Sequence, residues 1–347
     1  MASKGHRIVF PEAGRAAVEE FDVPSAGPNE LLIRTTHSLV SAGTEMTTLT
    51  SAIGSPKYPY YPGYSNVGVV EAAGKNVSGD HPAGTPVVSM GRHTSHFILD
   101  LSLERRVVGV GGVEYRGPEY VQKLPAGVSQ RDATFAVLGS VAIHGLRKAE
   151  PRLGNSAAVF GQGVVGQLTV MLLKAAGCRP VIAADLVASR LEKSKISGAD
   201  FLVDGSKEDS VEDVLRLTNR AGAELVFDAT RTPKTLPLMM KAAAQAGKVL
   251  IVGSLPGTVE IDAFTELQLR ELTIIGVFQP ASPLQAHPYN PFTQSRNRLT
   301  FLNLLADGTL AVNHLITHTP KWSEGPAIFD MIHEGPASWM GIVFDWT

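Results

Sequence analysis

The spacing of hydrophobic positions changes along the chain and separates two kinds of structure. Between residues 7 and 128, short apolar runs at 30–35, 67–72, 86–90 and 96–101 are separated by Gly and Pro. Short apolar runs between turn-forming residues are typical of β-strands. This part of the chain is therefore predicted to be an irregular β domain.

The middle of the chain has a regular pattern instead. A long Ala/Leu/Val-rich segment without Pro, residues 133–149, predicts a helix. After Asn155, apolar strands alternate with longer helical segments. The strands are predicted at 156–160, 181–184, 201–203, 225–228, 248–252 and 272–278, and the helices at 164–176, 188–197, 208–221 and 233–245. Such alternation predicts βαβ units around a parallel sheet.

The remaining residues return to the first pattern. A Pro/Asn/His-rich loop is predicted at 279–290, a helix at 296–306 and a short apolar run at 341–346. The fold class is therefore predicted to be α/β with two domains. Residues 1–151 and 279–347 form a β-rich catalytic or substrate domain, and residues 152–278 form a doubly wound, parallel-sheet domain.

Composition narrows the possible environments and partners. The chain has 347 residues, a formal net charge of −2 and one cysteine, Cys178. This charge gives no reason to expect binding to nucleic acid or to an anionic membrane. One cysteine excludes an intramolecular disulfide and any zinc site that needs two thiolates. No apolar stretch is long enough for a membrane span, and residues 1–15 do not look like a signal peptide. We expect a cytoplasmic protein.

A glycine-rich motif gives the first functional indication. Gly161, Gly163 and Gly166 follow a predicted strand and open a predicted helix. In this context, Gly permits a tight turn, close approach of a pyrophosphate to the backbone, and close packing of helix on strand. The motif therefore predicts a dinucleotide site.

Asp185 indicates which dinucleotide is bound. It ends the next predicted strand, 19 positions after Gly166, where a carboxylate accepts hydrogen bonds from the adenosine ribose. Its charge would repel a 2′-phosphate, which favours NAD(H) over NADP(H), although it could instead cap the helix near Ala188. The predicted cofactor-binding residues are Gly161, Gly163, Val164, Val165, Gly166, Asp185, Arg190, Thr230 and Gly253.

Several further segments resemble a known group of enzymes. They are Ser41-Ala-Gly-Thr-Glu45, residues 62–68 (PGYSNVG), residues 124–127 (LPAG), residues 227–230 (FDAT) and residues 247–253. Together with the glycine motif, they resemble the medium-chain dehydrogenase/reductase superfamily, which contains zinc alcohol dehydrogenases and quinone reductases. The resemblance covers nearly the whole chain. It implies a GroES-like β domain that carries the substrate cleft, and a Rossmann domain.

The chain departs from this superfamily at the metal positions. The catalytic-zinc ligands, usually Cys, His and Cys, correspond to Ala42, Tyr64 and Ser140. Alanine has no ligand atom, and neutral Tyr and Ser are poor zinc ligands. The four-cysteine structural lobe is also absent from the sequence. We therefore expect a zinc-independent member.

Without zinc, a side chain must move the hydroxyl proton, or the reaction must avoid that step. The catalytic candidates are Tyr64, His93, His96 and Glu45; a structural role is the alternative for each. The substrate-binding candidates are Asn66, Ser140, Gln279, His287 and Asn290. For the 279–290 loop, the alternative is a solvated surface loop.

Polar, uncharged candidates of this kind suit a polyhydroxylated ligand. The sequence therefore predicts an NAD(H)-dependent, zinc-independent oxidoreductase that interconverts a secondary alcohol and a ketone on a sugar, cyclitol or polyol. The alternatives are an enone or quinone reductase of the same superfamily and a non-catalytic NAD(H)-binding protein. The apolar strand at 272–278 would form a sheet edge, and by the resemblance we expect a homodimer.

Overall fold

The chain folds into two compact units. The computed structural model describes residues 3–52, 56–77, 79, 81–102, 104–108, 114–118, 121–207, 209–335 and 339–347. Unit 1 comprises Met1–Leu138, Pro280–Gly308 and Ile316–Thr347, and unit 2 comprises Gly139–Gln279 and Thr309–Leu315. Wherever the chain passes from one unit to the other, it does so between residues that belong to the units themselves, without a long linker.

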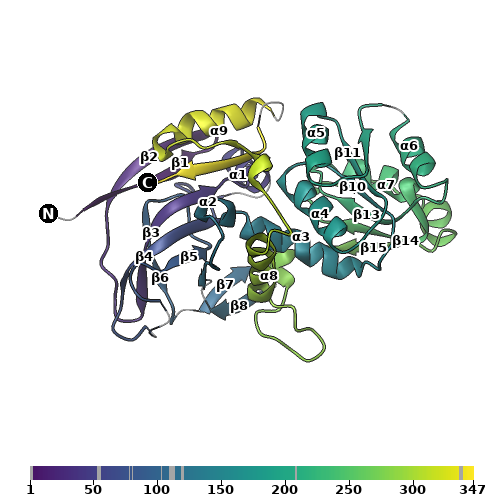
Figure 1. Cartoon of the computed structure of the whole chain (residues 1–347). Coiled ribbons are helices and arrows are strands. Elements are labelled where there is room, and N and C mark those ends of the chain that lie inside the picture. The colour runs from purple at the N-terminus through teal and green to yellow at the C-terminus, as the bar shows by residue number, and fades with distance from the viewer. Residues whose placement is uncertain are drawn as a thin grey trace. The chain divides into compact units, whose positions relative to one another are not determined.

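Unit 1 is built mainly from antiparallel strands (Figure 1). Its strands are β1 (Lys4–Glu12), β2 (Arg15–Asp22), β3 (Glu30–Leu39), β4 (Asn66–Ala73), β5 (Pro86–Ser89), β6 (His96–Asp100), β7 (Glu104–Val108), β8 (Glu114–Pro118), β9 (Val121–Lys123), β16 (Ile316–His318) and β17 (Gly341–Asp345). A seven-stranded sheet has the order β16-β17-β3-β4-β5-β9, with β6 also paired to β3. The pairs β1–β2 and β7–β8 form two further sheets.

The α-helices that accompany these strands in the described residues are α1 (Ala42–Leu49), α2 (Gln130–Ala133), α8 (Gln294–Ala306) and α9 (Gly325–Glu334). Met46 and Leu49 of α1 pack with Ile328 and Phe329 of α9 in one apolar cluster, which also contains Trp346. Burial of such side chains stabilises each by roughly 1.5–3 kcal/mol. This cluster therefore secures α1, whose first residues belong to the candidate site.

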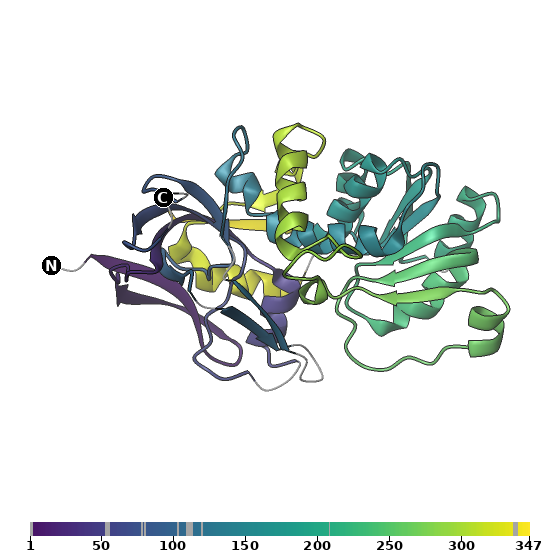
Figure 2. The ribbon, with the colours of Figure 1, turned by 90° about the horizontal axis from the view of Figure 1, so that it is seen from below.

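Unit 2 is a six-stranded parallel sheet in the order β12-β11-β10-β13-β14-β15, covered by helices on both faces (Figure 1). The strands are β10 (Ala157–Phe160), β11 (Val181–Asp185), β12 (Phe201–Asp204), β13 (Ala223–Asp228), β14 (Ala243–Ile251) and β15 (Thr273–Gly276). The helices are α3 (Ala136–Ala149), α4 (Val164–Ala175), α5 (Ala188–Ile196), α6 (Ser210–Leu217) and α7 (Leu236–Ala242). Figure 2 shows β13, β14 and β15 side by side, in green.

The sheet of unit 2 is buried on both faces because successive residues of each strand point to opposite sides. Ala157 and Val159 contribute to one apolar cluster, with helices α3 and α4. Ala158 and Phe160 contribute to the other, with α6 and α7. This strand order reverses direction beside β10, and ligands bind at such a switch point in open α/β sheets. The predicted α/β fold, GroES-like plus Rossmann, is confirmed.

Three boundaries differ from the sequence-based prediction. Residues from Gly139 group with unit 2, whereas the predicted domain boundary lay at 151/152, because Ala149 and its α3 neighbours pack into the sheet cluster of unit 2. The segment Thr309–Leu315 also groups with unit 2. The helix predicted at 233–245 ends at Ala242, because Ala243 already pairs with Ala223 in the parallel sheet.

No helix in the described part of the chain is long and apolar enough to cross a membrane.

Candidate functional site

The three glycines of the β10–α4 loop have three different structural roles. Gly161 has φ +88°, and a Cβ there would lie 2.8 Å from the carbonyl carbon of Ala229. A Cβ on Gly166 would lie within 1.8 Å of the Gly161 carbonyl oxygen, so helix and loop touch. Gly163, the N-cap of α4, faces open space instead, with no side-chain cap. Val164 and Val165 are the first residues of α4, and the N–H groups of a first helical turn have no partner within the helix. A phosphate could therefore approach these N–H groups through the open space beside Gly163.

Asp185 lies at the end of β11, beside this loop. Its carboxylate accepts hydrogen bonds from the backbone N–H of Gln162, at 2.5 Å, and of Val187, at 2.8 Å. The N-cap of α5 is Val187, without a side-chain cap, so Asp185 does not cap that helix. Burial lowers the pKa of Arg190, and the nearby carboxylate of Asp185 only partly opposes this.

A fully buried polar network supports the same loop from below. The Gln162 side chain donates to the Val159 carbonyl at 2.7 Å and accepts from the Ser194 hydroxyl at 2.9 Å. Gln167 of α4 donates to Ser194 at 2.9 Å and accepts from Ser197 at 2.7 Å. These residues were not predicted as site residues; the signal that could have found them was two glutamines within and just after a glycine-rich loop.

Asp228 is a second carboxylate that the sequence analysis did not select. It is fully buried at the end of β13, accepts from the Thr230 backbone N–H at 2.8 Å and from the Thr235 hydroxyl at 3.2 Å, and its carbonyl accepts from the N–H of Gly253 at 2.7 Å. Burial raises its pKa, and the Thr230 and Thr235 hydrogen bonds only partly oppose this. Thr230 and Gly253, both predicted cofactor residues, are thus positioned by Asp228.

Unit 1 contains the candidate catalytic side chains. Tyr64 is half-buried, and its hydroxyl donates a short hydrogen bond to the Ser41 hydroxyl and lies 3.3 Å from the Thr44 hydroxyl. Burial raises the pKa of Tyr64, and the hydrogen bonds with Ser41 and Thr44 only partly oppose this. At neutral pH this phenol therefore keeps its proton.

Glu45 and His93 form a buried pair behind this tyrosine. The distance from Glu45 Oε2 to His93 Nε2 is 3.0 Å, and the two side chains are 2% and 0% exposed. Glu45 Oε1 accepts from the Ser41 N–H at 2.9 Å, and His93 Nδ1 lies 2.7 Å from the Ser38 hydroxyl, which also accepts from Trp346 Nε1. Both ring nitrogens of His93 are therefore engaged, and the pair holds Ser41 at the start of α1.

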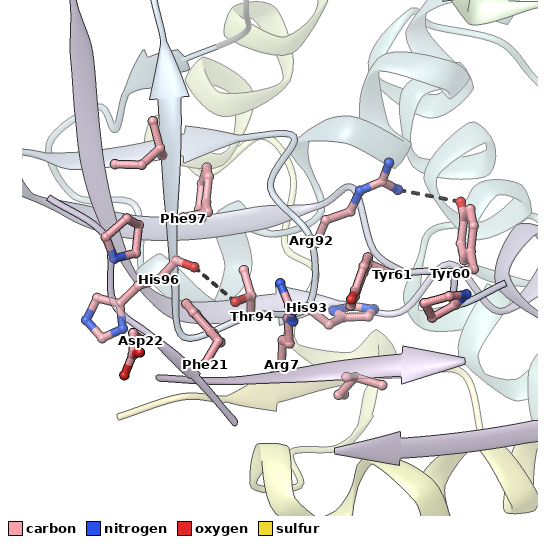
Figure 3. Close-up of a pocket in the computed structure, with 14 residues that line it drawn as sticks. Arg7, Phe21, Asp22, Tyr60, Tyr61, Arg92, His93, Thr94, His96 and Phe97 are labelled. Atoms are coloured by element: carbon pink, nitrogen blue, oxygen red, sulfur yellow. Dashed lines mark hydrogen bonds between the residues drawn. The ribbon is translucent and has the colours of Figure 1, made fainter. Parts of the chain in front are cut away.

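His93 also borders a cavity of about 600 Å³ in unit 1 (Figure 3). Figure 3 shows Arg92 extending to the Tyr60 hydroxyl, with which it makes a long hydrogen bond of 3.5 Å. His96 lies at another side of the cavity, and its Nε2 is 3.3 Å from Glu71. Burial lowers the pKa of His96 despite Glu71. Tyr64 is not among the residues that line this cavity, so His96 and Tyr64 do not face the same cavity.

The three positions where the resemblance places zinc ligands carry no thiolate and no imidazole. Ala42 is the first residue of α1, Tyr64 donates to Ser41, and Ser140 is buried in α3. Within the described ranges, no group of three or more His, Cys, Asp or Glu side chains could hold a metal ion.

The remaining candidates are placed as follows. Asn66 is buried, and its amide donates to the Thr35 hydroxyl at 2.9 Å. Gln279 is buried in unit 2, at the point where the chain enters unit 1. His287 and Asn290 are exposed and pair through their backbones in a tight loop. Their roles in substrate binding remain predictions.

Comparisons with known proteins agree with this architecture. Residues 164–291 match the zinc-binding dehydrogenase family. Human sorbitol dehydrogenase is 26% identical over 346 residues, covering 94% of this chain and 92% of that protein. A putative zinc-binding dehydrogenase from Sinorhizobium meliloti, solved with NADP, has a TM-score of 0.82 at 21% identity, covering 99% of each chain. Galactitol-1-phosphate dehydrogenase from Escherichia coli has a TM-score of 0.80 at 19% identity, covering 98% of this chain and 99% of that one.

The structural similarities show the shared fold, and the sequence similarity extends along nearly the whole chain. Over residues 164–291 the sequence is thus similar to zinc-binding dehydrogenases, and along nearly the whole chain it is similar to an oxidoreductase of the alcohol dehydrogenase-like kind.

Proposed function

We propose that this protein is an NAD(H)-dependent oxidoreductase that interconverts a secondary alcohol and a ketone of a polyol, sugar or cyclitol without a catalytic zinc ion. The observation that carries the proposal is the site around Tyr64, whose hydroxyl lies beside those of Ser41 and Thr44 at a position where the resemblance places a metal ligand. Similarity to sorbitol dehydrogenase along nearly the whole chain supports the substrate class.

The glycine loop and Asp185 would hold the cofactor. The open space above Gly163 admits a pyrophosphate to the start of α4, and Asp185 offers a carboxylate at the ribose position. When bound, the nicotinamide supplies or accepts the hydride. Because a second negative charge beside Asp185 is unfavourable, NAD(H) is favoured over NADP(H).

Tyr64 would manage the proton. In ketone reduction, the phenol donates its proton to the carbonyl oxygen as the substrate carbon receives the hydride, and the product is a neutral alcohol. The phenol is protonated at neutral pH, so it carries the proton that this direction needs. In alcohol oxidation the same group must first lose its proton, so this direction is expected to accelerate as the pH rises. Ser41, positioned by Glu45, orients the phenol.

Cofactor binding is the first test. The protein is stripped of metal with a chelator and titrated with NADH and NADPH by calorimetry. We expect NADPH to bind at least about tenfold more weakly, and Asp185→Ser to remove that preference. Asp204→Ser is the matched control, because Asp204 ends the adjacent strand and pairs in register with Asp185. Equal or tighter NADPH binding by the unaltered protein would contradict the NAD(H) assignment.

Turnover is the second test. Oxidation of sorbitol, xylitol, galactitol and inositol is followed by NADH absorbance, with and without added Zn²⁺. Tyr64→Phe is expected to lower kcat by about 10²–10⁴-fold while NADH affinity is retained. Tyr58→Phe is the control, because the Tyr58 hydroxyl also bonds α1, at the Thr48 carbonyl. Activity that appears only with Zn²⁺ would refute zinc independence.

The edge strand β15 supports a homodimer. Among the described residues it pairs with β14 alone, and Phe278 just beyond it is 47% exposed. An unpaired strand edge can pair with a second copy across a two-fold axis. Sedimentation should give twice the chain mass, and Gly276→Pro, which removes a backbone donor on the side of β15 that faces away from β14, should weaken the dimer. A monomer at micromolar concentration would contradict this.

A further inference from the structure

The cavity of unit 1 is not lined by the candidate catalytic tyrosine, and the proposed function does not use it. Its volume of about 600 Å³ is within the range of pockets that hold small organic ligands. Aromatic rings form much of its wall, from Phe21, Tyr60, Tyr61 and Phe97 (Figure 3). Such a wall suits the flat apolar body of an aromatic ligand, because aromatic rings pack well against one another.

Arg7, a cation of this cavity, is held by the protein itself. Figure 3 shows it between Phe21 and Tyr61, and its guanidinium carbon lies 5.1 Å and 4.3 Å from the centroids of their rings. It also donates two hydrogen bonds to the carboxylate of Glu19, at 3.1 and 3.2 Å. The charge of Arg7 is therefore already balanced by a carboxylate.

The acidic side chain of the cavity lies away from its second arginine. Figure 3 shows Asp22 and His96 at one end of the cavity, and Arg92 with Tyr60 at the other. Asp22 pairs with Lys4 Nζ at 2.9 Å. Burial lowers the pKa of His96, so its ring is neutral at neutral pH. The end that contains Asp22 therefore does not neutralise the charge of Arg92.

Arg92 has no carboxylate partner in the part of the chain that the structure describes. Its Nη1 lies 3.3 Å from the Gly63 carbonyl oxygen and 3.5 Å from the Tyr60 hydroxyl, and its guanidinium carbon lies 5.6 Å from the Tyr60 ring centroid. Both hydrogen bonds are long and use one nitrogen, whereas a guanidinium has five N–H donors. The remaining donors match the two oxygens of a carboxylate, which arginine binds in a bidentate manner.

The wall of the cavity is in direct contact with the turn that carries Tyr64. Gly63, the residue before Tyr64, has φ +96°, and a Cβ there would lie 2.6 Å from the backbone nitrogen of His93. The His93 N–H donates to the Pro62 carbonyl at 2.9 Å, and Arg92 donates to the Gly63 carbonyl. Two adjacent residues of the cavity wall therefore hold the backbone immediately before Tyr64.

We propose that this cavity binds a small aromatic carboxylate, and that binding lowers the activity of the Tyr64 site. The ring of the ligand packs on the aromatic wall, and its carboxylate pairs with Arg92. Hydrogen bonds to an ionised acceptor are stronger than those to a neutral one, so the carboxylate displaces the Gly63 carbonyl from Arg92. The turn before Tyr64 then loses a hydrogen bond, and the phenol is held less firmly. The effect on activity rests on the proposed function, whereas the binding of the ligand does not.

Binding is tested with benzoate and its neutral analogue benzamide, by calorimetry at physiological salt. Benzoate should bind at least about tenfold more tightly than benzamide, and saturating NADH should change its Kd by less than about twofold. Because this comparison uses the unaltered protein, it does not depend on the folding of any variant. Equal binding of the two compounds, or displacement of benzoate by NADH, would overturn the site.

Substitution of Arg92 tests which residue recognises the carboxylate. Arg92→Gln should remove the preference for benzoate over benzamide. Arg15→Gln is the matched control, because Arg15 is also an exposed arginine of unit 1, pairs with Glu12 and does not line the cavity. Both variants should keep the melting temperature of the unaltered protein, since both side chains are exposed. Benzoate binding that R92Q retains in full would overturn the site.

The effect on the Tyr64 site is measured as turnover of the best polyol at increasing benzoate. Saturating benzoate should lower kcat by about 2–10-fold, the effect of one hydrogen bond, while the KM values for the polyol and NAD⁺ stay within about twofold. R92Q should show the lower kcat without benzoate and no further change with it, whereas R15Q should respond like the unaltered protein.

Three outcomes separate this inference from the proposed function. Inhibition that the polyol or NAD⁺ overcomes would place benzoate at the substrate or cofactor site and overturn the inference. An unchanged kcat with benzoate bound through Arg92 would overturn the regulatory role. Binding of benzoate that depends on Arg92, in a protein that turns over no substrate, would support the ligand site and refute the proposed function.

Discussion

Substitution of Glu45 by alanine tests whether the buried Glu45–His93 pair holds the candidate site together. The substitution removes the acceptor of the Ser41 N–H, at 2.9 Å, and the partner of His93 Nε2, at 3.0 Å. Each buried group left unpaired costs about 1–3 kcal/mol, and this substitution leaves two such groups, the Ser41 N–H and His93 Nε2. We therefore expect E45A to lower the free energy of unfolding by about 2–6 kcal/mol.

Glu45→Gln is the informative companion. It keeps one oxygen for the Ser41 N–H and replaces the other with an amide group that can donate to His93 Nε2. If hydrogen-bond satisfaction decides the outcome, E45Q should lose only about 1 kcal/mol. A loss as large as that of E45A would instead show that the carboxylate charge is essential.

Urea unfolding followed by tryptophan fluorescence measures both variants. The chain has three tryptophans, Trp322, Trp339 and Trp346, and all belong to or pack on the same apolar cluster of unit 1. The signal therefore reports the unit that contains the substitution, separately from unit 2. A midpoint shift at constant m-value gives the stability change. A loss below about 1 kcal/mol for E45A would refute the reasoning.

Three further predictions concern pH and the glycine loop. Hydrogen bonds with Lys321 and other donors outweigh burial and lower the pKa of Asp345 to about 2. The ionised carboxylate therefore stabilises the fold above the unfolded-state pKa, and this contribution is lost as the pH falls through about 2. D345N should be less stable by about 1–2 kcal/mol at pH 7, and urea midpoints should show the difference shrinking between pH 4 and pH 2. Burial raises the pKa of Asp228, so the unfolded state loses this proton first and stability falls as the pH rises from the unfolded-state pKa to the folded-state pKa. The melting temperature of D228N should therefore depend less on pH above about 4 than that of the unaltered protein, and an unchanged slope would contradict this. G163A should keep its melting temperature and lose NADH affinity, whereas G166A should lose both, because only the Gly166 Cβ meets backbone, at 1.8 Å.

The parallel-sheet half of the molecule was predictable because its signals are local. The glycine motif and Asp185 lie on consecutive elements, and the structure places the aspartate on the backbone N–H of Gln162 within that loop. By contrast, Glu45 and His93 are separated by 48 positions. Each could be selected as a titratable residue near a resemblance motif, but their pairing depends on how α1 packs against distant strands. Arg92 gave no signal beyond its charge, because its place on the wall of a cavity is a property of the folded chain.

The helix predicted at 233–245 shows why local preference can fail. Ala and Gln favour helices by only a few tenths of a kcal/mol per residue. Ala243 is fully buried and pairs with Ala223 of the neighbouring strand, so sheet hydrogen bonds and burial outweigh this preference. The predicted end of this helix, at residue 245, was therefore wrong, because β14 already begins at Ala243.

The path of the chain through unit 1 has a consequence for biosynthesis. Strand β17 lies inside the seven-stranded sheet, between β16 and β3, with Val343 opposite Leu39. A ribosome that has made residues 1–138 has therefore not yet supplied an interior strand of their sheet. Unit 2 needs only the short segment Thr309–Leu315 beyond Gln279, where His314 bonds Ser197 of α5 at 2.8 Å. During translation the nucleotide-binding half can thus mature first, while the other half waits with an exposed strand edge that chaperones would have to shield.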